Sequence, residues 1–296
     1  MLLFIFITHT AHVPLTTVAT GKLPVYIDAW VEAIQTTNPN TRIHIIADER
    51  QVELEEKEVK FHNFTLLKTL GKARLWNYQF QKYYLHHSRN KPQFIMFCVQ
   101  RFYALYSFML LNNYNQAWFF DSDISIVSTL PTSTSEIYTL KQSWGTSYAT
   151  KFTLSGLHKF NEFTSRFYTR ALSQIQTDIL NYGTSYPRFF DAYEKRNSVV
   201  WKSLSNWREF NAVEFSDMHL FRTYSVSNRV VDFELSKTAA LGLVSVKKLF
   251  CNACRINITD LIVLARETPL LGVHFQGRRK FLMPEFVKHY VAQYAP

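Results

Sequence analysis

Two carboxylates stand one residue apart in this chain, in the sequence Asp121-Ser122-Asp123, directly after the apolar run Ala117–Phe120. The aromatic run predicts a buried strand. Both carboxylates then lie in the loop past its carboxyl end, where open α/β sheets bind ligands. A hard cation such as Mg²⁺ or Mn²⁺ prefers oxygen ligands and can join carboxylates to a diphosphate. We therefore interpret Asp121 and Asp123 as metal ligands rather than as an acidic pair in an exposed turn.

A second group of reactive residue types lies near the C-terminus, in the run Val273–Lys280. His274 is placed at the end of an expected strand and can bind a metal through a neutral ring nitrogen. Gly277 allows the backbone to approach a phosphate closely, and Lys280 can neutralise a diphosphate together with a neighbouring arginine. Alone, His274 would be interpreted as a structural histidine. Combined with the two aspartates, the run predicts a metal–diphosphate clamp.

The elements that must position these residues alternate between strand and helix patterns in the first half of the chain, which indicates a mainly parallel sheet covered by helices. Strands are expected at Leu3–Ile7, Arg42–Ala47, Ala117–Phe120 and Leu270–Phe275. Helices are expected at Val25–Thr36, Leu70–His87, Gln100–Leu111, 157–180, 187–202 and Pro284–Tyr294. The fold class predicted from this order is α/β.

Four segments, in this order, resemble the GT-A glycosyltransferases, and most of all the retaining families that include glycogenin and the bacterial galactosyltransferases of lipopolysaccharide synthesis. Phe6–Thr8 resembles their first nucleotide-binding strand, and Gln100–Leu105 resembles their helix with an arginine that reaches the donor. Phe119–Asp123 resembles their DxD strand, and His274–Lys280 resembles their C-terminal HxxGxxK motif.

This resemblance implies a Rossmann-like GT-A domain over residues 1–296, with a nucleotide-sugar-binding half at 1–130 and an acceptor-binding half at 131–296. It implies a glycosyltransferase that uses a nucleotide-sugar donor, by default a UDP-sugar, and Mn²⁺ or Mg²⁺. The implied metal ligands are Asp121, Asp123 and His274. The implied donor-binding residues are Thr8, Arg101, Asp121, Gly277 and Lys280. Asp217, in the segment Ser216–His219, would be the catalytic residue that orients a donor or acceptor hydroxyl.

Alternatives stay open for several of these residues. Arg101 could form an ion pair on a helix surface, and Ser216 or Asp217 could cap a helix. Retention of configuration fits the resemblance, while inversion would use Asp217 or Glu214 as the base. Asp121 could instead be the nucleophile of a haloacid-dehalogenase-type phosphatase. That motif normally lies near the N-terminus, and no aspartate follows Asp260 here to complete its acidic pair. The chain could also be a non-catalytic glycan-binding relative.

The formal net charge of +10 favours anionic partners such as sugar nucleotides, acidic glycans or lipid headgroups. No dense run of Lys and Arg is present, so specific nucleic-acid binding is not expected, while peripheral membrane association is. The apolar run Leu2–Ile7 is too short to span a bilayer and lacks the flanks of a signal peptide. We therefore expect a cytoplasmic protein, or one on a membrane surface. The three cysteines do not predict a disulfide framework, and Cys251 and Cys254 are interpreted as loop residues.

Overall fold

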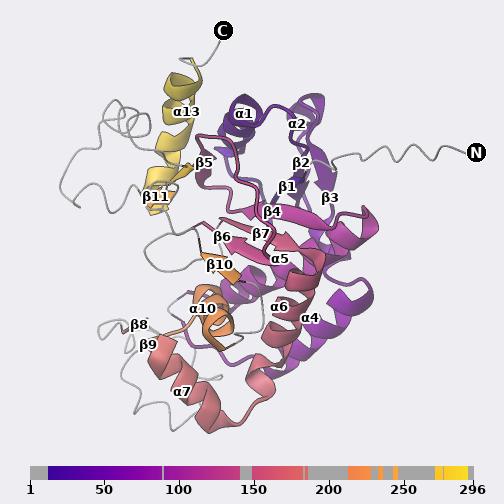
Figure 1. The fold of residues 1–296 in the computed structure, drawn as a ribbon, viewed down its shortest axis with the longest axis vertical. Helices are drawn as coiled ribbons and strands as arrows, with labels where there is room; N and C mark the ends of the chain where they lie inside the picture. Colours follow the sequence, from indigo (N-terminus) through magenta and orange to yellow (C-terminus); the bar gives the residue numbers. More distant parts are fainter. Residues whose placement is uncertain are drawn as a thin grey trace, which may run out of the picture.

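The computed structural model describes residues 13–88, 90–140, 149–182, 184–185, 213–227, 233–235, 243–245, 271–275 and 277–292. Figure 1 shows the arrangement of the helices and strands. The described helices are α1 Ile27–Thr37, α2 Val52–Glu56, α3 Phe64–Leu67, α4 Gly71–Tyr83, α5 Pro92–Leu111, α6 Leu154–Arg166, α7 Leu172–Tyr182, α10 Asp217–Ser227 and α13 Met283–Val291, with 3-10 turns η1 Phe167–Thr169 and η4 Gly277–Leu282.

A seven-stranded sheet forms the centre of the molecule, with strand order β10-β6-β7-β4-β1-β2-β3. Strands β3, β2, β1 and β4 run parallel, and β10 is parallel to β6, while β7 is antiparallel to both of its neighbours. The predicted α/β fold with a mainly parallel sheet is therefore confirmed. The strands of this sheet are β1 Leu15–Val18, β2 Ile43–Ile46, β3 Lys60–His62, β4 Gln116–Phe120, β6 Ile137–Thr139, β7 Ala149–Thr153 and β10 Phe233–Leu235.

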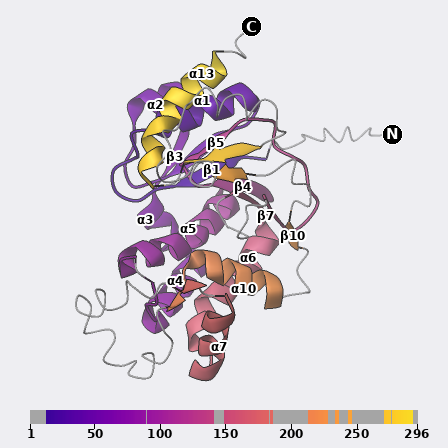
Figure 2. The same ribbon diagram turned by 90° about the vertical axis from the view of Figure 1, so that its left-hand side faces the viewer.

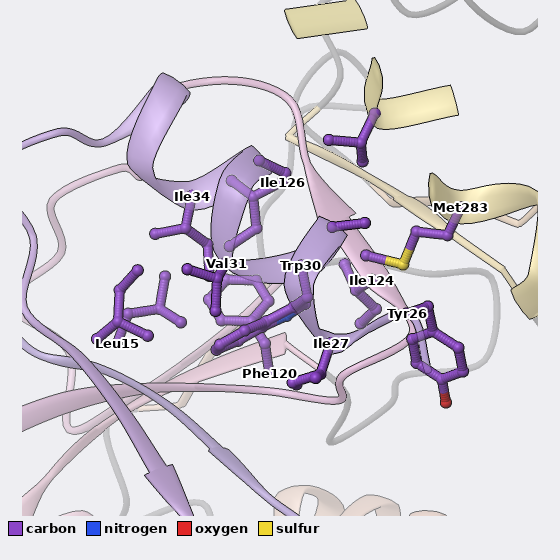
Figure 3. Close-up of a cluster of buried hydrophobic side chains, with 14 of the residues drawn as sticks. Leu15, Tyr26, Ile27, Trp30, Val31, Ile34, Phe120, Ile124, Ile126 and Met283 are labelled. Carbon is purple, nitrogen blue, oxygen red and sulfur yellow. The ribbon is translucent and has the colours of Figure 1, made fainter. Parts of the chain in front are cut away.

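Successive side chains of a strand point to opposite faces of the sheet, and both faces of this sheet carry apolar side chains. Helices therefore cover both faces. In β4, Trp118 and Phe120 face the core beneath α1 and α13, while Ala117 and Phe119 face the core beneath α5 and α6. The two helical layers lie on opposite sides of the sheet in both ribbon views (Figures 1 and 2). We call the core beneath α1 and α13 the first core and the core beneath α5 and α6 the second core. Figure 3 shows Trp30 of α1 among Phe120 and other side chains of the first core. Helix α1 is thereby fixed against the end of β4.

Helix α5 is the main element of the second core. It is long and apolar enough to cross a membrane by length and composition, but most of its residues are buried inside the protein. It begins at Pro92, at the first helical position that proline favours, and so starts earlier than the expected Gln100. Its contacts with α3, α4 and α6 show that it is a core helix of this domain.

The strand between β2 and β4 was not predicted. It is β1, in which two buried threonines, Thr16 and Thr17, replace the apolar residues expected of a central strand. Thr16 Oγ1 donates a hydrogen bond of 2.7 Å to the carbonyl of Trp118, which satisfies its hydroxyl inside the sheet. The strand predicted at Leu3–Ile7, the helix predicted at 187–202 and both Cys251 and Cys254 lie outside the described residues.

The remaining predicted elements are found with shifted ends. Helix α4 ends at Tyr83 rather than at His87, and the helical pattern over 157–180 divides into α6, η1 and α7. Three short strands stand apart from the main sheet and pair with one another: β5 Ile124–Ile126, β11 Leu243–Ser245 and β12 Gly272–His274. A further pair is formed by β8 Thr184–Ser185 and β9 Val213–Glu214. The sheet of β5, β11 and β12 matters most for function, because it joins the two predicted motifs.

Candidate active site

The two aspartates lie in a tight turn between β4 and β5. The backbone N–H of Ile124 donates to the carbonyl of Asp121 at 3.1 Å, which closes the turn and redirects the chain out of the main sheet. Because β4 is parallel to β1, the turn lies at the edge where the carboxyl ends of these strands meet. The position predicted for Asp121 and Asp123 is therefore confirmed.

Arg101 links this turn to a distant helix. It extends from the middle of α5, and its Nη1 donates to Asp121 Oδ1 at 2.6 Å while its Nη2 donates to Asp217 Oδ2 at 2.9 Å. The guanidinium lies over the ring of Phe119, at 4.8 Å from its centroid. Only 6% of the arginine side chain is exposed, so Arg101 does form an ion pair, but a buried one and not the surface pair of the alternative interpretation.

Asp217 is the first residue of α10, and Ser216 occupies the preceding N-cap position. The Ser216 side chain lies 3.1 Å from His219 Nδ1, and its backbone N–H also donates to that nitrogen. The Asp217 carboxylate binds Arg101. Asp217 thus faces Arg101, and its role in orienting a substrate hydroxyl stays a prediction. The side chain of Glu214, the alternative base, is not among those described.

Asp123 is paired with residues from the C-terminal motif. Lys280 Nζ lies 2.7 Å from Asp123 Oδ2, and His274 Nε2 lies 3.3 Å from Asp123 Oδ1. Antiparallel pairing of β5 with β12 places His274 opposite Ile124, and the N–H of Phe275 donates to the Asp123 carbonyl at 2.8 Å. The sheet of β5 and β12 therefore brings together the two motifs that the sequence analysis singled out separately.

Tyr26 is a site residue that sequence reasoning missed. It precedes α1, and Lys280 Nζ lies 5.9 Å from its ring centroid, while Ser122 and Lys280 both act on the pKa of its hydroxyl. Burial raises the pKa of this phenol, although the nearby Lys280 opposes the change. The ring itself belongs to the first core, where Figure 3 shows it beside Met283. An aromatic residue before an apolar helix looks like core, so no sequence signal marked its hydroxyl.

The two aspartates of the turn have different electrostatic environments. Burial raises the pKa of Asp121 to about 6; Arg101 opposes this effect, while Asp123 and Asp217 add to it. Burial would also raise the pKa of Asp123, but His274 and Lys280 outweigh it and hold this pKa below its ordinary value. Asp123 is therefore the more firmly ionised carboxylate of the pair.

The fit of these residues to a divalent cation can be judged from their polar atoms. Asp123 Oδ1 is buried and lies 3.3 Å from His274 Nε2, but it accepts no hydrogen bond of good geometry from a described residue. A carboxylate oxygen and an imidazole nitrogen that face each other in this way fit two ligands of one cation. Asp121, the third predicted ligand, is turned to Arg101, and within the described ranges no group of three His, Cys, Asp or Glu side chains is gathered as a metal site.

Of the other predicted site residues, Gly277 and Lys280 are described by the structure and Thr8 is not. Lys280 lies in η4, which begins at Gly277, and is directed to Asp123. Thr8 lies outside the described residues, so its contact with a nucleoside stays a prediction. The structure thus brings together Arg101, Asp121, Asp123, Asp217, His274 and Lys280.

No protein-family model matches this sequence, and no curated protein matches it. Among solved structures, it is similar to the apo form of mouse xyloside xylosyltransferase 1, at 10% identity and a TM-score of 0.48, over 90% of this chain and 98% of that chain. It is also similar to the galactosyltransferase LgtC in complex with donor and acceptor sugar analogs, at 9% identity and a TM-score of 0.41, over 95% of each chain. A third similar structure is the glycosyltransferase GlyE of Streptococcus pneumoniae TIGR4, at 10% identity and a TM-score of 0.41, over 95% of this chain and 63% of that chain.

Proposed function

We propose that this protein is a metal-dependent glycosyltransferase that moves a sugar from a nucleotide-diphosphate sugar to a hydroxyl group of an acceptor. One observation carries the proposal. Four segments that are far apart in the sequence deliver two aspartates, a histidine, a lysine and an arginine–aspartate pair to the carboxyl edge of one α/β sheet. Cations and carboxylates at this edge are suited to a sugar linked to a diphosphate.

The metal-binding part of the proposal concerns Asp121, Asp123 and His274. These residues would hold Mn²⁺ or Mg²⁺, and the ion would neutralise negative charge on the diphosphate of the donor. The buried Oδ1 of Asp123, which faces His274 and accepts no hydrogen bond from the part of the chain that the structure describes, supports this role. Asp121 supports it less directly, because its carboxylate is occupied by Arg101 in the structure.

The chain's own cations would act on the charge that develops during transfer. Lys280, now paired with Asp123 and close to the ring of Tyr26, would stabilise the leaving nucleoside diphosphate. Arg101 and Asp217 form a buried, hydrogen-bonded pair, which would hold the hydroxyls of a sugar in one orientation. Asp217 remains the catalytic candidate that orients the donor or the acceptor hydroxyl.

Finer features of the proposal rest on the family resemblance of the motifs. These are a UDP-sugar as donor, retention of configuration, and Thr8 and Gly277 as donor contacts. The same resemblance supports residues 1–130 as the donor-binding half and residues 131–296 as the acceptor-binding half. The acceptor would be a glycan, a lipid or a protein, used in the cytoplasm or at a membrane surface.

Release of nucleoside diphosphate from a set of UDP- and GDP-sugars, with and without Mn²⁺, tests this proposal. The expected result is metal-dependent release from one donor that falls by about 10²–10³-fold in Asp123→Asn and Lys280→Met. Arg166→Gln, at an exposed ion pair with Glu162, is the control and should retain the wild-type rate. Release of phosphate from a phosphomonoester, without transfer from any donor, would instead favour the phosphatase alternative. Donor binding without turnover would favour the non-catalytic one.

A further inference from the structure

The chain contains a long segment without acidic residues. Residues 59–120 hold no Asp or Glu, but they include eight Lys and Arg residues: Lys60, Lys68, Lys72, Arg74, Lys82, Arg89, Lys91 and Arg101. Only the last of these serves the candidate active site. Three others lie on one helix, α4, which therefore carries positive charge alone.

The outer face of α4 combines this charge with exposed apolar side chains. On the inner side, Ala73, Trp76, Asn77 and Phe80 are buried against α5 and α6. On the outer side, Leu75 and Tyr78 are 61% and 66% exposed, and their i, i+3 spacing places them next to each other. Lys82, four residues after Tyr78, continues the row that Leu75 and Tyr78 form along the helix. Lys72 and Arg74 lie on either side of this row.

The cations of this face are not neutralised by neighbouring carboxylates. Lys72, Arg74 and Lys82 form no ion pair with a described residue. On the adjacent helix α6, Glu162 is engaged by Arg166 at 2.8 Å. Helix α2 offers a contrast, because its exposed Val52 stands next to Glu53 and Glu55. The positive potential of α4 is therefore available to an anionic partner.

We propose that the outer face of α4, defined by Lys72, Arg74, Leu75, Tyr78 and Lys82, docks on the surface of an anionic lipid bilayer. Helices that lie in a membrane interface combine a small apolar stripe with flanking Lys and Arg. Leu75 would enter the boundary between headgroups and acyl chains, Tyr78 would lie at headgroup level with its hydroxyl in water, and the three cations would face lipid phosphates. A nucleic acid would use the cations but would give no role to Leu75.

Docking in this way would leave one helix, α4, between the bilayer and α5. Helix α5, which carries Arg101, packs directly behind α4, and Gln100 Nε2 donates to Asn77 Oδ1 at 2.9 Å. Both ribbon views place α4 in the half of the molecule away from α13, so its outer side is not covered by that helix (Figures 1 and 2). The proposal concerns binding alone and stands independently of the proposed transferase activity.

Flotation of the full-length protein with vesicles tests the proposal. Vesicles of phosphatidylcholine are compared with vesicles that also contain phosphatidylglycerol, at low and at high salt. Wild type should float with the anionic vesicles, and high salt should release it. The triple variant K72Q/R74Q/K82Q should bind more weakly by about fivefold for each lost cation. The double variant L75S/Y78S should bind about tenfold more weakly at unchanged charge.

Two matched controls separate this face from general properties of the chain. Val52→Ser removes an equally exposed apolar residue from an acidic helix, and R50Q/K57Q/K288Q removes three cations elsewhere. Both should float like wild type. All variants are first checked for an unchanged thermal unfolding midpoint, since the replaced side chains are exposed. Equal flotation of wild type and both α4 variants would overturn the proposal. So would flotation with neutral vesicles, or release of the protein from vesicles by nuclease.

Discussion

Arg101 and Asp121 form a 2.6 Å ion pair in a setting where the arginine side chain is 6% exposed. The same guanidinium also holds Asp217 at 2.9 Å, so a single cation balances two carboxylates from different parts of the chain. A divalent cation that used Asp121 as a ligand would have to compete with Arg101. The pair therefore couples the proposed metal ligands to the catalytic candidate on α10.

Arg101→Met removes the cation that pairs with two carboxylates, those of Asp121 and the more deeply buried Asp217. We expect the free energy of unfolding of the metal-free protein to fall by about 3–5 kcal/mol, as for other broken buried pairs. Urea unfolding monitored by circular dichroism measures this change. Arg166→Met, whose pair with Glu162 is exposed, should lose less than about 1 kcal/mol. Equal losses in the two variants would mean that the Arg101 pair contributes no more than a surface contact.

Mn²⁺ should bind more tightly to Arg101→Met than to wild type, because the competing cation of Asp121 has been removed. The measurement is the shift of the unfolding midpoint with Mn²⁺ concentration, which reports binding without turnover. Asp123→Asn serves as the control and should show no shift. A larger shift in wild type than in Arg101→Met would contradict competition. Absence of any shift in both would count against the metal site itself.

His44 should make the fold sensitive to acid. It is buried in β2, with its Nδ1 at 2.9 Å from His62 Nε2 and its Nε2 at 3.2 Å from the hydroxyl of Tyr114. Burial lowers its pKa from 6.5 to about 3, and the charges of His62 and Arg42 act in the same direction. Since folding favours the neutral ring, the stability from this residue is complete above pH 6.5 and is lost as the pH falls toward the folded-state pKa.

The expected slope is about 1.4 kcal/mol of unfolding free energy per pH unit for one such histidine. Urea unfolding at a series of pH values below 6.5 should give a shallower acid slope for His44→Gln than for wild type. His289→Gln, an exposed substitution on α13, should keep the wild-type slope. If His44→Gln leaves the slope unchanged, acid sensitivity comes from other groups, such as the buried His86 and His87, whose pKa values burial lowers to about 4.

Gly156→Ala should destabilise the protein, although alanine favours helices. Gly156 lies in the first turn of α6, and a Cβ added there would stand 2.6 Å from the carbonyl oxygen of Glu136 and 2.9 Å from Ile137 Cγ1. Backbone cannot move aside cheaply, so we expect a loss of about 1–3 kcal/mol in unfolding free energy. Ser155→Ala, an exposed neighbour, should cost less. A stabilised Gly156→Ala would show that α6 can shift away from β6.

The fold class could be predicted from the sequence because apolar periodicity is a local property. The buried aromatic strand before Asp121 and the helix around Arg101 were both found in this way. Strand β1 was missed for a physical reason. Its central threonines are polar in the sequence, but one is satisfied by the carbonyl of Trp118, a partner that exists only after the sheet has formed.

Residue types and spacing in the sequence alone determined that Asp121 and Asp123 follow a buried strand and that His274 and Lys280 belong to a second cationic motif. Tertiary structure alone decided which of these groups meet. Pairing of β5 with β12 places His274 and Lys280 beside Asp123. Packing of α5 between β4 and α10 places Arg101 in contact with both Asp121 and Asp217. The reason is that an ion pair between distant segments depends on strand register and helix packing, which no local pattern records.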